Sequence, residues 1–187
     1  MSTYNNKVLL LIGGTRLINE AVVLHFLEQG VGQVRAYSGD EEGLTALRDR
    51  LQSAARVKYY VGDVNDPAYL AEAMDGVDYV VYEAWTLNPE TCEADPAEAC
   101  TTLLNPVNTV MDTAIQQRVK KLVVIGQDYV EPLSDAHDLI SALLEKVVVA
   151  QGRHQNEADD TSICYIRPTS EDVLELINAS FVERGRV

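Results

Sequence analysis

The sequence has few of the features that mark secreted, membrane-spanning or metal-binding chains. Only three of its 187 residues are cysteine, an odd number at spacings that match no metal motif. We therefore expect three reduced thiols in a reducing, cytoplasmic compartment. No apolar run approaches the roughly eighteen residues of a membrane-spanning helix, and the polar start, Met1 to Lys7, does not resemble a signal peptide. Its histidines, His25, His137 and His154, are scattered, so no metal site is predicted.

Basic residues are also scarce. The chain has 15 Lys and Arg against 29 Asp and Glu, a formal charge of −14. Such a surface repels phosphate backbones, so nucleic acid is not an expected partner. A protein partner would have to dock through neutral or basic patches. Because 47% of the residues are hydrophobic, the chain can bury a sizeable core, and we expect a single domain over residues 1–187.

Short β-branched runs alternate with helical patterns along the chain. Strands are expected at Val8–Ile12, Gln33–Ser38, Val57–Val61, Val77–Tyr82, Lys121–Gly126 and Ser162–Ile166. Helices are expected from Leu17 to Gln29, after Asp40, from Asp66-Pro67 to near Gly76, from Asp95-Pro96 to about Gln117 with a bend at Pro106, from Ala136 to Gln151, and from Glu171 to Glu183. The stretch between Tyr82 and Asp95 is expected to be a loop. This alternation predicts a doubly wound, Rossmann-like α/β fold: a parallel sheet of order 3-2-1-4-5-6 with helices on both faces.

Several short motifs follow the expected strands in a characteristic order. They are Gly13-Gly14-Thr15, Tyr37-Ser38-Gly39-Asp40-Glu41, Gly62-Asp63-Val64-Asn65-Asp66, Gly76-Val77-Asp78-Tyr79-Val80-Val81, Val119-Lys120-Lys121-Leu122-Val123-Val124 and Ile166-Arg167-Pro168. In this order and spacing the chain resembles the extended short-chain dehydrogenase/reductase family, nearest to the UDP-N-acetylglucosamine 4,6-dehydratases and polysaccharide-biosynthesis epimerases. The resemblance implies a dinucleotide site at Gly13, Gly14, Thr15, Arg16, Ser38, Asp40, Asp63 and Val64.

The chain departs from this family at the phosphate-binding turn. The family's TGxxGxxG positions read Ile12, Gly13, Arg16 and Asn19, so only the first glycine remains. The missing glycines would let the pyrophosphate approach bare backbone and let the helix pack closely on the strand. Arg16 either fills this space and excludes the dinucleotide or swings out to pair with a phosphate. We favour exclusion, because losing both glycines also perturbs the turn.

The adenosine half of the site is better preserved. Asp63 and Val64 match the pair that contacts adenine in this family, although an aspartate at a strand end also commonly caps a turn. Ser38 and Asp40 match residues near the ribose. Gly39 replaces the basic residue that supports a 2′-phosphate in many relatives, so NAD is favoured over NADP if a dinucleotide binds. Because Arg16 is expected to exclude the dinucleotide, the leading expectation is that no cofactor binds.

The proton-transfer residues differ most. An ungapped alignment places His137 and Ser141 at the family's tyrosine and lysine positions, and Gln127, Asp128 and Tyr129 at its Thr-Asp-Lys set. The small residues that line the nicotinamide pocket become Tyr82-Glu83-Ala84-Trp85, which predicts a narrower pocket. A hydrolase-like use of Asp128, His137 and Ser141 lacks a nucleophile elbow and is disfavoured.

Three functions remain open at this point. The leading hypothesis is a non-catalytic, dehydratase-like domain that serves as a structural or interaction subunit, as a homo-oligomer or with another protein. The first alternative is a nucleotide-binding regulator that keeps the adenine half-site. The second is an NAD-dependent epimerase, dehydratase or reductase in which His137 is the acid/base. The chain also ends soon after its sixth strand, whereas members of this family continue into a smaller domain that grips the nucleotide-sugar.

Overall fold

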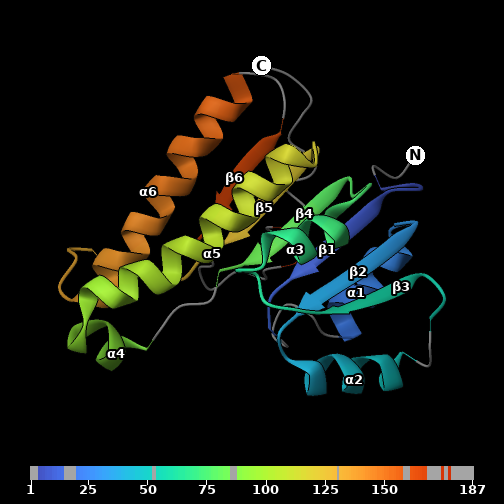
Figure 1. The fold of residues 1–187 in the computed structure, drawn as a ribbon, viewed down its shortest axis with the longest axis horizontal. Helices are drawn as coiled ribbons and strands as arrows, with labels where there is room; N and C mark the ends of the chain where they lie inside the picture. The colour runs from blue at the N-terminus through green and yellow to red at the C-terminus, as the bar shows by residue number, and fades with distance from the viewer. Residues whose placement is uncertain are drawn as a thin grey trace.

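Six parallel strands form one sheet in the computed structural model, in the order β3-β2-β1-β4-β5-β6 (Figure 1). The structure describes residues 4–14, 20–51, 54–84, 88–129, 131–157 and 161–167, together with Leu174 and Ile177. The strands are β1 (Val8–Ile12), β2 (Gln33–Ser38), β3 (Val57–Val61), β4 (Tyr79–Glu83), β5 (Lys121–Ile125) and β6 (Ser162–Ile166). The predicted fold class and strand order are therefore confirmed.

The helices connect the strands and cover both faces of the sheet. They are α1 (Glu20–Glu28), α2 (Glu41–Arg50), α3 (Pro67–Met74), α4 (Pro89–Ala94), α5 (Pro96–Gln116) and α6 (Ala136–Glu157). Proline stands in the first turn of α3, α4 and α5, directly after an Asp or Asn whose side chain caps the helix. No helix among the described residues is long and apolar enough to cross a membrane.

Alternate residues of each strand enter two separate cores, as the pleat of a sheet buried on both faces requires. On one face, Leu10 and Val80 pack with apolar residues of α3, α5 and α6. On the other face, Leu11 and Val81 pack with α1 and α2. Leu11 lies opposite Ala36 of β2 and Val81 of β4, which places β1 at the centre of the sheet.

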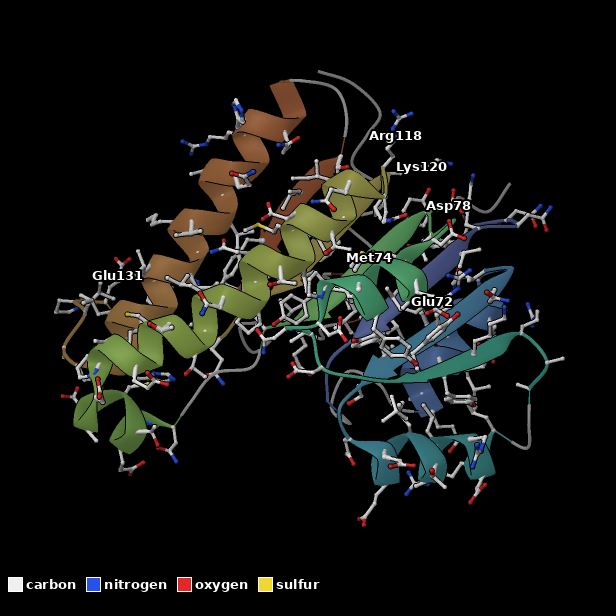
Figure 2. The ribbon with its side chains drawn as sticks, viewed as in Figure 1. Glu72, Met74, Asp78, Arg118, Lys120 and Glu131 are labelled. Carbon is white, nitrogen blue, oxygen red and sulfur yellow. The ribbon has the colours of Figure 1, made fainter. Side chains whose placement is uncertain are left out.

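Polar contacts hold the amino-terminal edge of the sheet. Oδ1 of Asp78, the residue before β4, accepts hydrogen bonds from Nζ of Lys120 at 2.6 Å and of Lys7 at 3.3 Å. Its Oδ2 accepts from the Val8 amide at 3.0 Å. Figure 2 shows Asp78 and Lys120 next to each other at this edge, opposite the edge where the strands end. The opposite, carboxyl edge of the sheet carries the cavity.

The structure corrects several predicted boundaries. Residues 89–94, expected to be a loop, form α4, in which the side chain of Asn88 accepts from the Thr91 amide at 2.8 Å. The fourth strand runs from Tyr79 to Glu83 rather than from Val77 to Tyr82, and the fifth ends at Ile125, one residue before Gly126. Helix α5 has Pro106 in its interior and ends at Gln116, one residue before the predicted end. Helix α6 extends to Glu157 instead of ending at Gln151, so His154 lies in its last turn. The final predicted helix, 171–183, lies outside the described residues except for Leu174 and Ile177, both helical.

Candidate functional site: a cavity at the carboxyl ends of the strands

A cavity of about 650 Å³ opens at the carboxyl ends of β1, β2, β3 and β4. Its described lining consists of Gly13, Gly14, Tyr37, Ser38, Gly39, Asp40, Val61, Gly62, Asp63, Val64, Tyr82 and Glu83. The strand order reverses between β1 and β4, because the chain goes from β3 at one edge back to β4 beside β1. Ligands of doubly wound folds bind at this switch point. Six of the eight predicted cofactor residues line the cavity. The other two, Thr15 and Arg16, lie outside the described residues, as does Trp85.

The end of β2 supplies the polar wall beside the first turn. Ser38 is buried, and its Oγ accepts a hydrogen bond from the Asp40 amide at 3.1 Å. Asp40 is exposed and caps α2, because its Oδ1 accepts from the Gly43 amide at 2.9 Å. Its carboxylate is thus fixed at the rim. The amide of Gly13 donates to the Tyr37 carbonyl at 3.2 Å and joins this wall to the end of β1.

The loop after β3 supplies the facing wall. Oδ1 of Asp63 accepts from the Asn65 amide at 2.9 Å and from its side-chain Nδ2 at 3.0 Å. Asp63 therefore caps a turn and lines the cavity at once, so the two interpretations of this residue are compatible. A Cβ at Gly62 would lie 2.6 Å from both Oη of Tyr37 and Cδ1 of Tyr69. Only glycine fits between these rings without displacing them.

The β4 end of the cavity is formed by larger groups. Tyr82 and Glu83 are both buried, and both are part of the lining. Burial raises the pKa of the Tyr82 phenol, so this group stays protonated at neutral pH. Among the described lining residues three are carboxylates, Asp40, Asp63 and Glu83, and none is lysine or arginine. The described acidic side chains of the cavity can therefore accept hydrogen bonds from hydroxyl or amino groups of a ligand.

The five residues at the family's catalytic positions lie elsewhere. The described lining of the cavity includes none of them: Gln127, Asp128, Tyr129, His137 and Ser141. Oη of Tyr129 donates to Oε2 of Glu145 at 3.0 Å. The guanidinium of Arg167 lies 4.7 Å from the centre of the Tyr129 ring, and its Nε is 4.0 Å from Oδ1 of Asp128.

His137 and Ser141 lie four residues apart on α6 but do not bond to each other. Nε2 of His137 lies 2.8 Å from Oε1 of Gln127. Ser141 is 1% exposed, and its Oγ has no hydrogen-bond partner among the residues that the structure describes. Asp128 approaches Arg167 instead of His137, so the structure does not assemble a Ser-His-Asp arrangement from these residues.

The structure also brings together residues that the sequence analysis did not connect. Asp135 lies directly before α6, His137 and Asp138 lie in its first turn, and ligand atoms of the three residues lie within 4.8 Å of one another. Oε1 of Glu93, from α4, accepts a hydrogen bond from the Ala136 amide. An aspartate directly before a helical pattern is an N-cap signal, so the place of Asp135 was readable from sequence, whereas the contact with α4 was not.

Comparison with known proteins places this geometry in context. A family model described as polysaccharide biosynthesis protein matches residues 9–169. The UDP-glucose 4-epimerases of Rickettsia conorii and Rickettsia felis are each 33% identical over 166 residues, which is 87% of this chain and 48% of theirs. The chain therefore spans about half the length of these curated relatives.

Solved structures share the fold. Pen from Bacillus thuringiensis has a TM-score of 0.77 at 22% identity, over 97% of this chain and 59% of that one. WbmF of Bordetella bronchiseptica, solved in complex with NAD+ and UDP, has a TM-score of 0.62 at 19% identity, over 83% and 48%. DesIV of Streptomyces venezuelae, a dTDP-glucose 4,6-dehydratase with NAD and TYD bound, has a TM-score of 0.65 at 18% identity, over 80% and 52%.

Proposed function

Because this chain belongs to the polysaccharide biosynthesis protein family, whose model matches residues 9–169, we propose that it binds NAD in the cavity at the carboxyl ends of β1 to β4. One observation carries the proposal: all six described members of the predicted cofactor set line the same cavity. Two solved neighbours that share the fold, WbmF and DesIV, hold NAD. These observations support the nucleotide-binding alternative. Arg16, on which the expected exclusion of the dinucleotide rests, lies outside the described residues.

Isothermal titration of the full chain with NAD+ tests this proposal. We expect one saturable site, weakened by Asp63→Ala, which removes a carboxylate from the cavity wall and its turn-capping bonds. Asp112→Ala, at an exposed position on α5, is the matched control and should leave binding unchanged. Absence of heat at millimolar NAD+ from folded protein would end the proposal.

The proposal also holds that the bound cofactor is not turned over. In the family, a lysine lowers the pKa of the catalytic tyrosine. The imidazole of His137 and the hydroxyl of Ser141, which stand at these two positions, do not reproduce that pair. Both residues also lie outside the described lining of the cavity. The competing function is UDP-glucose 4-epimerisation with His137 as acid/base, and the 33% identity to two such epimerases favours it. Conversion of UDP-glucose to UDP-galactose, abolished by His137→Gln, would establish that function instead.

An assembly role is a second candidate, supported by an apolar strip on α6. Leu139 is 59% exposed and Leu143 is 41% exposed, one turn apart on the same helix face. We propose that a second copy of this chain covers the strip, since these two leucine side chains carry no charge that would repel an acidic copy. Sedimentation should show a dimer that Leu139→Glu separates into monomers, and monomeric wild-type protein would rule the dimer out.

A further inference from the structure

We propose that the amino-terminal end of α6 binds a Zn²⁺ ion through His137 and Asp138 of its first turn and Asp135 directly before it, at a site separate from the cavity. The ligand atoms of these residues lie within 4.8 Å of one another, and Nδ1 of His137 is 3.9 Å from Oδ1 of Asp138. Ligands on one tetrahedral Zn²⁺ lie roughly 3.5 Å apart, given metal–ligand bonds of about 2.0–2.2 Å. An ion would thus draw these groups inward by about an ångström or less.

The histidine is already oriented for coordination. Oε1 of Gln127 can only accept a hydrogen bond, so the 2.8 Å contact fixes the proton on Nε2 of His137. In the neutral ring the lone pair is then on Nδ1, the atom that faces Asp138. Metal-binding histidines almost always donate their other N–H to an oxygen acceptor in this way. Gln127 comes from the segment after β5, so it is independent of the helix that carries the ligands.

Ser141 is the second observation that indicates a ligand. It follows Asp138 by three residues and His137 by four, so it shares their helix face. Side chains on a helix lean toward its amino terminus, which directs the Ser141 hydroxyl toward the turn that holds both ligands. This side chain is 1% exposed, and its Oγ lacks a hydrogen-bond partner within the described part of the chain. A water in the fourth position of the ion would satisfy this buried hydroxyl.

The charge at this end of α6 favours a cation. A helix amino terminus carries about half a positive charge, which alone would repel a metal ion. Three carboxylates surround it: Asp135 accepts from the Asp138 amide at 2.8 Å, and Glu93 accepts from the Ala136 amide. Burial, and then the negative charge of Asp135, raise the pKa of the nearby Cys92 thiol, in line with an anionic environment. One imidazole with two carboxylates is a donor set that suits Zn²⁺ better than Mg²⁺ or Ca²⁺.

Titration of the tag-free, chelator-treated full chain with Zn²⁺ tests the site. We expect one ion per chain and a higher Tm at saturation, because the ion binds only the folded state. Asp135→Asn retains the helix cap and His137→Gln retains a polar side chain, and each should lower Zn²⁺ affinity by about tenfold or more. His154→Gln replaces the exposed histidine in the last turn of α6 and should bind as wild type does.

Two results would overturn the proposal. One is folded wild-type protein that shows no saturable Zn²⁺ binding, or that binds Mg²⁺ in its place. The other is wild-type affinity in Asp135→Asn, which should fold even if His137→Gln does not. The inference does not depend on NAD binding, so either can fail alone.

Discussion

The phenol of Tyr37 donates a 2.8 Å hydrogen bond to the backbone oxygen of Asp63. Tyr37, the residue before the last one of β2, has no exposed surface, whereas Asp63 is an exposed loop residue after β3. This bond therefore ties the core of the sheet to one wall of the cavity. The same ring lies beside Gly62, which explains why the loop approaches the strand so closely.

Tyr37→Phe should lower the free energy of unfolding by about 1 kcal/mol, the net value of a typical hydrogen bond. It should also weaken NAD binding, because the loop that carries Asp63 loses its attachment to β2. Urea unfolding and NAD+ titration measure the two effects. Tyr69→Phe is the control, since that ring packs 5.9 Å from Tyr37, centre to centre, and its hydroxyl is not part of the Tyr37–Asp63 bond. Equal losses in both variants would argue against the proposed role of this bond.

The same tyrosine predicts a stability change in alkali. Burial, followed by the charge of Asp66 and the neighbouring Tyr69 and Asp63, raises the pKa of Tyr37 from 10.0 to about 12. The folded state then holds the proton more tightly than the unfolded state, so this stability is complete below pH 10 and is lost as the pH rises through about 12. Urea unfolding between these two pH values should show a smaller loss for Tyr37→Phe than for wild type. Parallel pH curves would contradict the assignment.

Asp78 predicts a loss of stability in acid. Burial acts to raise its pKa, but the hydrogen bonds from Lys120, the Val8 amide and Lys7 outweigh it, so the pKa lies below the usual carboxyl value. The stabilisation is therefore present above the ordinary pKa and disappears as the pH falls through the lowered one. Because Lys120 is half exposed, Asp78→Asn should cost only about 1 kcal/mol at neutral pH.

Urea unfolding at several pH values checks this prediction. The difference between wild type and Asp78→Asn should shrink toward zero as the pH falls. Asp75→Asn, at an exposed position three residues earlier, should follow the wild-type curve. A difference that persists unchanged in strong acid would mean that the charge of Asp78 is not its cause.

Local sequence was sufficient to predict the sheet. The inner strands β1, β4 and β5 are mostly apolar runs buried on both faces, and right-handed crossovers leave few alternatives for the strand order. The cofactor positions came from the family resemblance, and the six described ones line one cavity because strand ends at one edge of a parallel sheet lie together. Helix α4 was missed because six residues are too few for a periodic pattern. Its Asn88-Pro89 start is nevertheless the same cap-and-proline signal that marks α3 and α5.

The contacts that escaped prediction join segments distant in sequence. Gln127, His137 and Glu93 come from the segment after β5, from α6 and from α4, and no single stretch of sequence encodes their contacts. The end of α6 is a similar case. Gly152 has the appearance of a helix stop, yet the helix continues past it. A glycine is required here because the residue lies against the backbone of β6.

Gly152→Ala tests that explanation directly. A Cβ at this position would lie 2.5 Å from the carbonyl oxygen of Ile163, a backbone atom that cannot move without disturbing β6. We expect a loss of about 1–3 kcal/mol in the free energy of unfolding, typical of overpacking, although alanine is the better helix former. Gly39→Ala, where the nearest atom to a new Cβ is 3.6 Å away, should be nearly neutral. Denaturant unfolding measures the free energy of unfolding of both variants. A Gly152→Ala variant more stable than wild type would mean that helix propensity outweighs the close contact.

Asp40 both caps α2 and lines the cavity, and a single substitution can separate these two roles. Asparagine retains the oxygen that accepts from Gly43, so Asp40→Asn should keep the stability of the wild type while removing one negative charge from the rim. If the adenosine ribose lies near Ser38 and Asp40, as the family resemblance implies, that carboxylate repels the 2′-phosphate of NADP. A charge pair at about 4 Å in water is worth roughly 1 kcal/mol, so the affinity for NADP+ relative to NAD+ should rise about fivefold. Titration of both cofactors against wild type, Asp40→Asn and the exposed control Asp49→Asn measures this ratio. An unchanged ratio in Asp40→Asn would place the 2′ position of the bound ribose away from β2.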